Sequence, residues 1–321
     1  MTREKKKQPF SKSRKRSKYK VTNWAEYNQF LRNRGNINFM IASNMLEYWY
    51  DDHGENRKRG RPRRYSDVAI LRCLEIRCLF GLKLRQTQGF IDWLFEMAGL
   101  PINCPDYTTL SKRMKSLNLR SLYKTQAREF SCIAMDSTGV QTYTGNEWLE
   151  NKHGKQYNRR IWKKLHILVS DTGMILADST TEHTVDDRSQ IEQLIAGIKA
   201  EEFLGDRGYD GESIYQLLRK KGIKPVIRPP NSQATAKSSQ DQTERDIAVE
   251  YQQQKGYHAW RVKNNYGRRE RAENTFFRFK SSFGSKFLSR DDKNMTNEMS
   301  IKCHLLNKMF EIGKPISIPV C

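Results

Sequence analysis

The spacing of hydrophobic residues changes once along the chain, near residue 129, and this change separates two regions. Between residues 21 and 128, hydrophobic residues recur every three or four positions, which is typical of amphipathic helices. The segments with this spacing are Trp24–Leu31, Phe39–Trp49, Val68–Phe80 and Thr87–Met97. The first region is therefore predicted to be all-helical, with Ser66 as the N-cap of its third helix.

From residue 129 onward, hydrophobic and polar residues alternate, which indicates β-strands. The alternation predicts that Phe130–Tyr143 contains a strand that ends in a turn at Ser137–Gly139, and that Trp162–Ser170 is a second strand. A return strand at Met174–Asp178 is predicted after a turn at Asp171–Gly173. The elements predicted next are a helix at Asp187–Ile198, a strand at Phe203–Leu204, a helix at Ser213–Lys220 and a strand at Lys224–Ile227. This is the element order of a ribonuclease H-like domain, so the predicted fold class is α/β, with a mixed sheet flanked by helices.

The balance of charges indicates what this fold acts on. The chain has 321 residues, and 58 Lys and Arg against 36 Asp and Glu give a formal net charge of +22. Such an excess implies a polyanionic partner, with nucleic acid ahead of an anionic membrane surface. No hydrophobic run approaches the roughly 18 residues that span a bilayer, and the N-terminus lacks the hydrophobic segment of a signal peptide. We therefore expect nucleic acid as the partner, no membrane association and a cytoplasmic location.

Composition and pattern together predict the domain organisation. Residues 1–20 contain ten Lys or Arg and one Glu, which predicts a basic disordered tail, either bound to phosphates or merely solvated. Residues 21–128 are predicted to form the helical DNA-binding region, and residues 129–321 the ribonuclease H-like catalytic domain. Within that domain, a polar stretch at about 229–256 is rich in Gln, Ser and Thr and is interpreted as a surface insertion.

Candidate DNA-binding residues gather in a few basic segments. The segment at 56–65 contains Gly60 and Pro62, which break helices, and its cations suit an arm that enters a DNA groove. A short helix from about Thr108, preceded by the segment Leu84–Met97, suits the second helix of a helix-turn-helix, although basic helices are also often only solvated. The candidates are Arg59, Arg61, Arg63, Arg64, Lys112, Arg113, Lys115, Lys163 and Lys164.

Two aspartates stand where predicted strands end. Asp136 closes the first strand of the sheet, and Asp206 follows the strand at Phe203–Leu204 directly, between Gly205 and Gly208. Ligands of open sheets bind at the carboxyl ends of neighbouring strands, so we expect the two carboxylates to lie together. Taken singly, each aspartate is equally consistent with a turn or a helix cap.

The stretch from Tyr266 to Lys280 supplies a third carboxylate, Glu273. As one helix, it would place Tyr266, Arg269, Glu273 and Lys280 along one edge. A hydrophobic stripe beside that edge consists of Ala272, Phe276, Phe279 and Phe283. An ordinary amphipathic helix with an Arg269–Glu273 ion pair would show the same pattern. The two aspartates at strand ends favour instead a helix that carries Glu273 to the sheet.

Three neighbouring carboxylates predict a metal site. Close carboxylates repel one another, and a divalent cation is the usual remedy. All-oxygen ligands suit Mg2+ or Mn2+, whereas zinc is disfavoured because no thiolate or imidazole accompanies them. Two such ions about 4 Å apart support in-line phosphoryl displacement, which is the chemistry of nucleases and of DNA transesterification.

The motifs around these acids resemble those of bacterial insertion-sequence transposases of the DDE type. The resemblance is to the branch with the signature Y-(2)-R-(3)-E-(6)-K, here Tyr266, Arg269, Glu273 and Lys280 with every spacing kept. The sequences IAMDSTG around Asp136 and GDRGYDG around Asp206 are similar to the first and second acidic motifs of that family. The resemblance extends over about residues 24–312, nearly the whole chain.

The resemblance implies Asp136, Asp206 and Glu273 as the ligands of two Mg2+ or Mn2+ ions. It implies a DNA transposase that binds the terminal inverted repeats of its insertion sequence, cleaves DNA at the ends and joins the 3′-hydroxyls to target DNA. Phosphate near the metals would be held by Tyr266, Arg269 and Lys280. The implied partner is double-stranded DNA, and a homodimer is expected in the DNA complex because two ends must be held together. A bacterial, nucleoid-associated location follows.

Two alternatives from other classes stay open. A metal-dependent DNA endonuclease or resolvase of the same fold would share the three carboxylates but would not join DNA ends. A non-catalytic DNA-binding regulator would explain the positive charge but not the ordered acidic residues. A tyrosine recombinase acting through Tyr266 is disfavoured, because it would leave the three carboxylates without a role.

Overall fold

The computed structural model describes residues 18–36, 47–51, 62–119, 129–142, 162–230 and 243–320. The chain divides into two compact units, one made of residues 1–39 together with 309–321, and one made of residues 40–308. All the predicted chemistry falls in the second unit. Among the described residues, no helix is long and hydrophobic enough to cross a membrane.

The first unit joins the two ends of the chain. Strand β1 (Lys18–Val21) pairs antiparallel with β7 (Ser317–Val320), and helix α1 (Trp24–Arg34) follows β1. The Thr22 hydroxyl donates to the Ile316 carbonyl at 3.1 Å, which extends the pairing by one residue. Residues 18–20 of the predicted tail therefore lie in a strand, and residues 1–17 lie outside the described residues.

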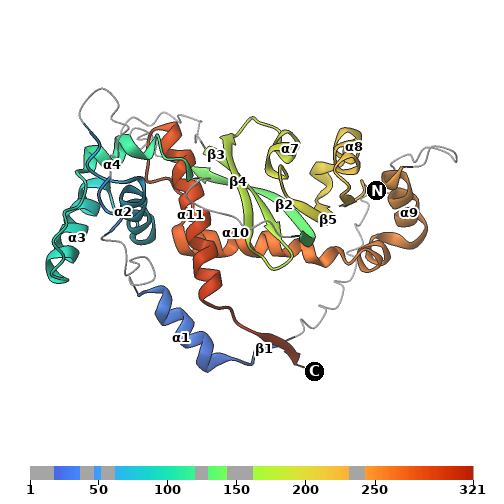
Figure 1. The fold of residues 1–321 in the computed structure, drawn as a ribbon. Helices are drawn as coiled ribbons and strands as arrows, with labels where there is room; N and C mark the ends of the chain where they lie inside the picture. Colours follow the sequence, from blue (N-terminus) through green and yellow to red (C-terminus); the bar gives the residue numbers. More distant parts are fainter. Residues whose placement is uncertain are drawn as a thin grey trace, which may run out of the picture. The chain divides into compact units, whose positions relative to one another are not determined.

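The second unit is built on a five-stranded mixed sheet with the order β4-β3-β2-β5-β6 (Figure 1). Its strands are β2 (Glu129–Gln141), β3 (Trp162–Ser170), β4 (Ile175–Glu182), β5 (Lys199–Gly205) and β6 (Lys224–Ile227). The pairs β2–β3 and β3–β4 are antiparallel, whereas β2–β5 and β5–β6 are parallel. The predicted mixed sheet flanked by helices is confirmed, and the elements follow one another in the predicted order.

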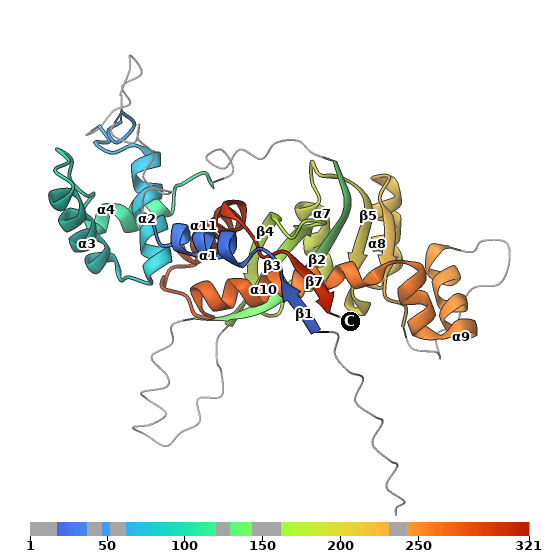
Figure 2. The same cartoon turned by 90° about the horizontal axis from the view of Figure 1, so that it is seen from below.

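Helices cover both faces of this sheet (Figures 1 and 2). One face packs against α7 (Ile191–Leu194) and α8 (Glu212–Lys220), and the other packs against α10 (Glu270–Phe283) and α11 (Asp292–Ile312). Side chains alternate between the two faces along β2, so that odd-numbered Ile133 and Met135 join the α8 core while Cys132 and Ala134 join the α10 core. The same alternation directs Asp136 to the α10 face.

The predicted helix at Asp187–Ile198 is wrong in type and in length. The segment forms a 3-10 turn, η2 (Asp187–Gln190), and then the four residues of α7. Gly197 has a φ of 75°, a left-handed conformation that lets the chain leave the helix and enter β5 at Lys199. The hydrophobic spacing of Ile191, Leu194 and Ile195 is satisfied by this short element, since all three are buried.

The polar stretch predicted as an insertion leads into a long helix. Residues 231–242 lie outside the described residues, and α9 (Glu244–Lys263) follows them. Thr243 caps α9, its side chain accepting from the Asp246 amide. Val249 and Trp260 of α9 are buried, and Trp260 belongs to the core of the α10 face. This part of the chain therefore packs onto the five-stranded sheet.

Residues 62–119 form three helices, α2 (Asp67–Phe80), α3 (Leu84–Met97) and α4 (Tyr107–Met114). Ser66 is the N-cap of α2, as predicted, with its hydroxyl oxygen accepting from the Ala69 amide at 3.0 Å. Most of the predicted helix at Phe39–Trp49 lies outside the described residues. The prediction that residues 21–128 are entirely helical stays a prediction.

A buried network of charges joins α2 to α11. Glu298 is fully buried and accepts from the Lys302 ammonium at 2.7 Å, while the Arg77 guanidinium of α2 lies 3.8 Å away. The same carboxylate accepts from the backbone amides of Leu288 and Ser289, each at 2.8 Å. Both cations are almost fully buried as well, so the helical region and the sheet share one continuous interior.

Candidate active site

Three structural elements bring the predicted carboxylates to one point. Asp136 lies within β2 facing α10, Asp206 directly follows β5, and Glu273 lies in the first turn of α10. The prediction that Asp136 closes its strand is wrong, because β2 continues to Gln141 and stays paired with β3 over that stretch. All three contact the guanidinium of Arg269. Its Nη2 lies 3.2 Å from Asp136 Oδ2 and 3.7 Å from Asp206 Oδ2, and its Nη1 donates to Glu273 Oε1. The residues predicted from separate motifs therefore lie together.

Local structure fixes each carboxylate differently. The Asp206 side chain caps the 3-10 turn η3 (Arg207–Tyr209) by accepting from the Gly208 amide at 2.7 Å. Asp136 accepts from the Ser137 amide at 2.9 Å. The exposed fraction rises from 18% for the Asp136 side chain to 45% for Asp206 and 56% for Glu273. The site is therefore anchored at Asp136 and opens toward Glu273.

Burial and charge act against each other at Asp136. Burial raises the pKa of the Asp136 carboxyl above its usual value, and the carboxylates of Asp206 and Glu273 raise it further. The Arg269 guanidinium and the hydrogen bond from the Ser137 amide lower the same pKa, but they do not cancel the effect of burial. The positive charge of Arg269 is thus needed to hold three negative groups at this distance.

The prediction that the four signature residues lie along one edge of one helix is wrong for the first two of them. Tyr266 and Arg269 belong to a 3-10 turn, η4 (Tyr266–Arg269), that precedes α10. Asn265 before it has a φ of 46°, a left-handed conformation that redirects the chain ahead of the helix. Arg269 still faces Glu273, and Lys280 is exposed in the last turn of α10.

Tyr266 points inward rather than toward solvent. It is 6% exposed, its ring packs on Trp260 with centroids 5.0 Å apart, and its hydroxyl donates to the Gly205 carbonyl at 2.9 Å. Gly205 immediately precedes Asp206, so this hydrogen bond ties the start of α10 to the strand end that carries the second acid. The geometry gives Tyr266 a positioning role, in place of the phosphate contact suggested by its spacing.

Replacing Tyr266 by phenylalanine tests that role. The change removes one buried hydrogen bond, while the Gly205 carbonyl still accepts from the Arg228 amide at 3.2 Å, so we expect a loss of about 0.5–1.5 kcal/mol in the free energy of unfolding. Affinity for DNA should stay unchanged, because the hydroxyl is already bonded inside the protein. Thermal unfolding and fluorescence anisotropy with a DNA fragment measure the two quantities. A variant of normal stability with weakened DNA binding would restore the phosphate role.

Asp187 was not predicted as part of the site, yet it lies against the strand of Asp136. Its Oδ2 accepts from the Ser137 hydroxyl at 2.6 Å, and its Oδ1 accepts from the Lys164 ammonium at 2.8 Å. Burial raises the pKa of Asp187, but the hydrogen bonds from Lys164 and Ser137 and the nearby charges of Lys164 and His166 together lower this pKa below its usual value. The sequence offered one indication of this contact. Ser137 directly follows Asp136 on β2, so alternation places its hydroxyl on the opposite face of the sheet from Asp136.

Several candidate DNA-binding cations already have acidic partners. Lys163 lies between Glu182 and Asp292, at 3.2 Å from the latter. Lys164, as noted, binds Asp187, and the side chains of both lysines are at most 20% exposed. Internal ion pairs therefore neutralise these two cations of β3.

The candidates of the helical region are also divided. Arg113 donates to Asp67 at 2.6 Å and to the Tyr65 carbonyl at 2.9 Å, which fixes α4 to the start of α2. Lys115 pairs with Asp291 at 2.8 Å, whereas Lys112 lies exposed on α4. Arg63 is exposed, Arg64 is stacked against Tyr50 and Tyr65, and Arg59 and Arg61 lie outside the described residues.

The chemistry of the donors fits a hard divalent cation. The three groups that converge on Arg269 are carboxylates, which Mg2+ and Mn2+ prefer. Within the described ranges, no group of three His, Cys, Asp or Glu side chains is arranged as it stands to hold a metal ion. Two buried polar atoms nearby, Arg269 Nε and the Tyr209 hydroxyl, have no hydrogen-bond partner among the described residues.

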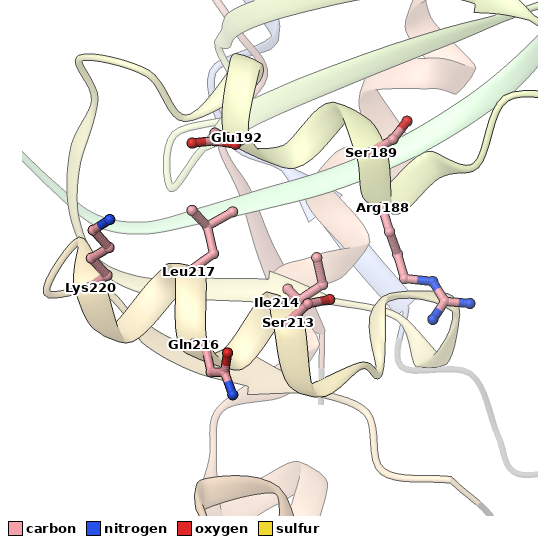
Figure 3. A pocket seen from close by; sticks show the side chains of 8 residues that line it. All are labelled: Arg188, Ser189, Glu192, Ser213, Ile214, Gln216, Leu217 and Lys220. Carbon is pink, nitrogen blue, oxygen red and sulfur yellow. The ribbon is translucent and has the colours of Figure 1, made fainter.

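A pocket elsewhere on the second unit contains none of these residues (Figure 3). It has a volume of about 390 Å3 and lies between η2–α7 and α8. Its lining residues are Arg188, Ser189, Glu192, Ser213, Ile214, Gln216, Leu217 and Lys220. Ile214 belongs to the core of the α8 face, so this pocket and the carboxylate site are on different sides of the sheet.

Comparison with known proteins decides the family. Residues 127–308 match a family model described as a transposase DDE domain, and residues 32–145 match a second model with the same description. The chain belongs to the DDE transposase family. The prediction of a DDE transposase is therefore confirmed at this level, while the branch with the Y-(2)-R-(3)-E-(6)-K signature stays a prediction.

Among curated proteins, this DDE transposase chain is similar to an uncharacterized protein of Aquifex aeolicus (strain VF5). The two are 32% identical over 194 residues, which cover 53% of this chain and 57% of that protein. The chain thus spans little more than half the length of this relative. The Aquifex protein adds no assigned activity, so the family match alone supports the identification.

Solved structures give weaker similarities. The piggyBac transposase synaptic complex with hairpin DNA is 9% identical with a TM-score of 0.32, over 91% of this chain and 77% of that one. The Mos1 mariner paired end complex with Mn is 8% identical with a TM-score of 0.22, over 92% and 89% of the two chains. The simian T-cell lymphotropic virus intasome in complex with the PP2A regulatory subunit B56 gamma is 10% identical with a TM-score of 0.25, over 60% and 59%. At these TM-scores the structural similarities carry no argument.

Proposed function

We propose that the chain binds the terminal inverted repeats of an insertion sequence, cleaves DNA at the element's ends and joins the 3′-hydroxyls to target DNA. The observation that supports this most directly is the meeting of Asp136, Asp206 and Glu273 at one guanidinium, from three elements of a DDE transposase chain. The formal charge of +22 supports DNA as the partner.

In this proposal, Asp136, Asp206 and Glu273 hold one or two Mg2+ or Mn2+ ions. When bound, such ions make the attacking oxygen more acidic and neutralise charge that develops on the phosphate. Asp136 would be the most rigid ligand because it is the most buried of the three. Glu273 would be the most adaptable, because its side chain is more than half exposed at the start of α10.

Basic residues of α10 and the turn before it would hold the DNA backbone. The planar guanidinium of Arg269 suits two parallel hydrogen bonds to a phosphate, and Lys280 would act as a point charge at the other end of α10. Among the other candidates, Arg63 and Lys112 are exposed and suit phosphates farther along the duplex. Paired Arg113, Lys163 and Lys164 are better assigned to the framework.

We further propose a homodimer in the DNA complex and a cytoplasmic, nucleoid-associated location. Joining both ends of one element to a target requires that two active sites act in one assembly. The division of labour between residues 21–128, for DNA binding, and residues 129–321, for catalysis, belongs to the same proposal. The Arg77–Glu298 contact between α2 and α11 supports a fixed link between the two regions.

A strand-transfer assay tests the proposed function. The full chain is incubated with Mg2+, a labelled duplex that carries the inverted repeat flanking the coding region, and a supercoiled target plasmid. We expect a nick or break at the repeat end, followed by products in which the label is joined to the plasmid. Cleavage without any joined product would assign the chain to the endonuclease or resolvase class, and binding without cleavage would assign it to the regulators.

A further inference from the structure

Arg269 occupies an unusual position for a phosphate-binding residue, because both Nη atoms of its guanidinium already contact carboxylates. Its side chain is 13% exposed and contacts acids from three separate elements. Nη2 is shared between Asp136 at 3.2 Å and Asp206 at 3.7 Å, while Nη1 is bound to Glu273. In this arrangement the guanidinium faces the protein rather than the solvent in which DNA would approach.

The same oxygens are the proposed metal ligands, so two cations compete for them. A divalent ion bound by Asp136 and Asp206 would lie close to Nη2, and like charges at such a distance in a partly buried site repel strongly. Without a metal, removal of the guanidinium would leave three carboxylates to repel one another. The site therefore needs a positive charge both with and without a bound metal, but the metal ion and the guanidinium cannot occupy the same place.

We propose that Arg269 is a cation placeholder, which holds the three carboxylates together until metal binds and is then displaced from Asp136 and Asp206. This inference rests on the proposed function, since it takes these carboxylates as the metal ligands. The displaced guanidinium can stay attached to Glu273 through Nη1, one helical turn away, and turn Nη2 toward solvent. Metal binding thereby frees the arginine for a DNA phosphate, which couples the two binding events.

Direct metal titration tests this inference without reference to catalysis. Mn2+ binding to the full chain, free of DNA, is measured by electron paramagnetic resonance of the unbound ion. Replacing Arg269 by glutamine removes the competitor, so we expect Mn2+ to bind about tenfold more tightly or better. The metal-free variant should unfold at a lower temperature than the wild type, and Mn2+ should raise its unfolding temperature by more.

Arg271→Gln is the matched control. It removes one positive charge from an exposed position of α10, two residues away, so it reports the general effect of charge on Mn2+ affinity. Mn2+ affinity of Arg269→Gln that is equal to or weaker than that of Arg271→Gln would overturn the placeholder role. Asp136→Asn separates this failure from failure of the proposed function, because unaltered Mn2+ binding in that variant would remove the metal site itself.

A measurement on the wild-type chain covers the case in which Arg269→Gln does not fold. In a protein labelled with 15N-arginine, the Arg269 Nε–H resonance is identified by its absence from the spectrum of Arg269→Lys. We expect this resonance to shift on addition of Mg2+ without DNA, with saturation at the Mg2+ concentration that fills the site. A resonance that stays in place while Mg2+ binds would show that the guanidinium is not displaced.

Discussion

Replacing Glu273 by glutamine is expected to abolish both DNA cleavage and strand transfer, with a loss of at least about a thousandfold in rate. Glutamine keeps the shape of the side chain but removes the negative charge that a divalent ion requires. The Glu273 side chain is 56% exposed, and α10 is held to the sheet by buried Ala272, Phe276 and Phe279, so the fold should be unaffected. The loss would therefore lie in the chemistry.

DNA affinity provides the internal check on this variant. The basic residues that we propose to contact DNA are unchanged, so binding of the repeat should remain within a few-fold of the wild type. Glu270→Gln is the matched control, because Glu270 lies in the same first turn of α10 but pairs with Arg261 instead of facing the aspartates. Rates are measured by single-turnover cleavage with excess protein. Substantial cleavage by Glu273→Gln would remove this residue from the site.

The sheet and the carboxylates were predictable from the sequence because each depends on a local signal. Alternation located β3 and β6 to the residue, and the small residues around Asp206 indicated the end of β5. The small residues after Asp136 wrongly indicated a strand end, because β2 continues through them to Gln141. The regular spacing of Glu273 with Phe276 and Phe279 predicted a helix packed on the sheet, which α10 is. Because β2 and β5 are neighbouring parallel strands, a helix packed on the α10 face can bring Glu273 to both aspartates.

Other features depend on contacts between distant residues, which no local pattern reports. The spacing of Tyr266 suggested a surface residue, but its hydroxyl is bound to Gly205, and the left-handed Asn265 replaces the first helical turn by a 3-10 turn. Lys163 was interpreted as a DNA contact because its acidic partners, Glu182 and Asp292, are far away in the sequence. A basic side chain on a strand therefore predicts a phosphate contact only when no carboxylate of the folded protein already pairs with it.

The largest effect on stability is expected from Glu298→Gln, at the buried contact between α2 and α11. Glu298 has no exposed surface, and its carboxylate faces the charges of Lys302 and Arg77, which are 1% and 2% exposed. Removing the negative charge leaves two buried cations without a counter-charge, which typically costs about 3–5 kcal/mol. Thermal and urea unfolding should show this loss. Glu129→Gln breaks a pair with Lys199 in which both side chains are nearly four-fifths exposed, and it should have little effect.

The dependence of this difference on pH identifies its electrostatic origin. Burial raises the pKa of Glu298, but Lys302, Arg77 and the Leu288 amide lower it by more, so the folded value lies below the ordinary 4.5. A carboxyl whose pKa is lower in the folded state stabilises the protein above the unfolded pKa, and this contribution disappears as the pH falls through the folded value. The gap in stability between wild type and Glu298→Gln should therefore be constant above about pH 5 and narrow progressively below 4.5. A gap that stays the same down to the acid unfolding of the wild type would assign the loss to packing around Glu298 instead of to its charge.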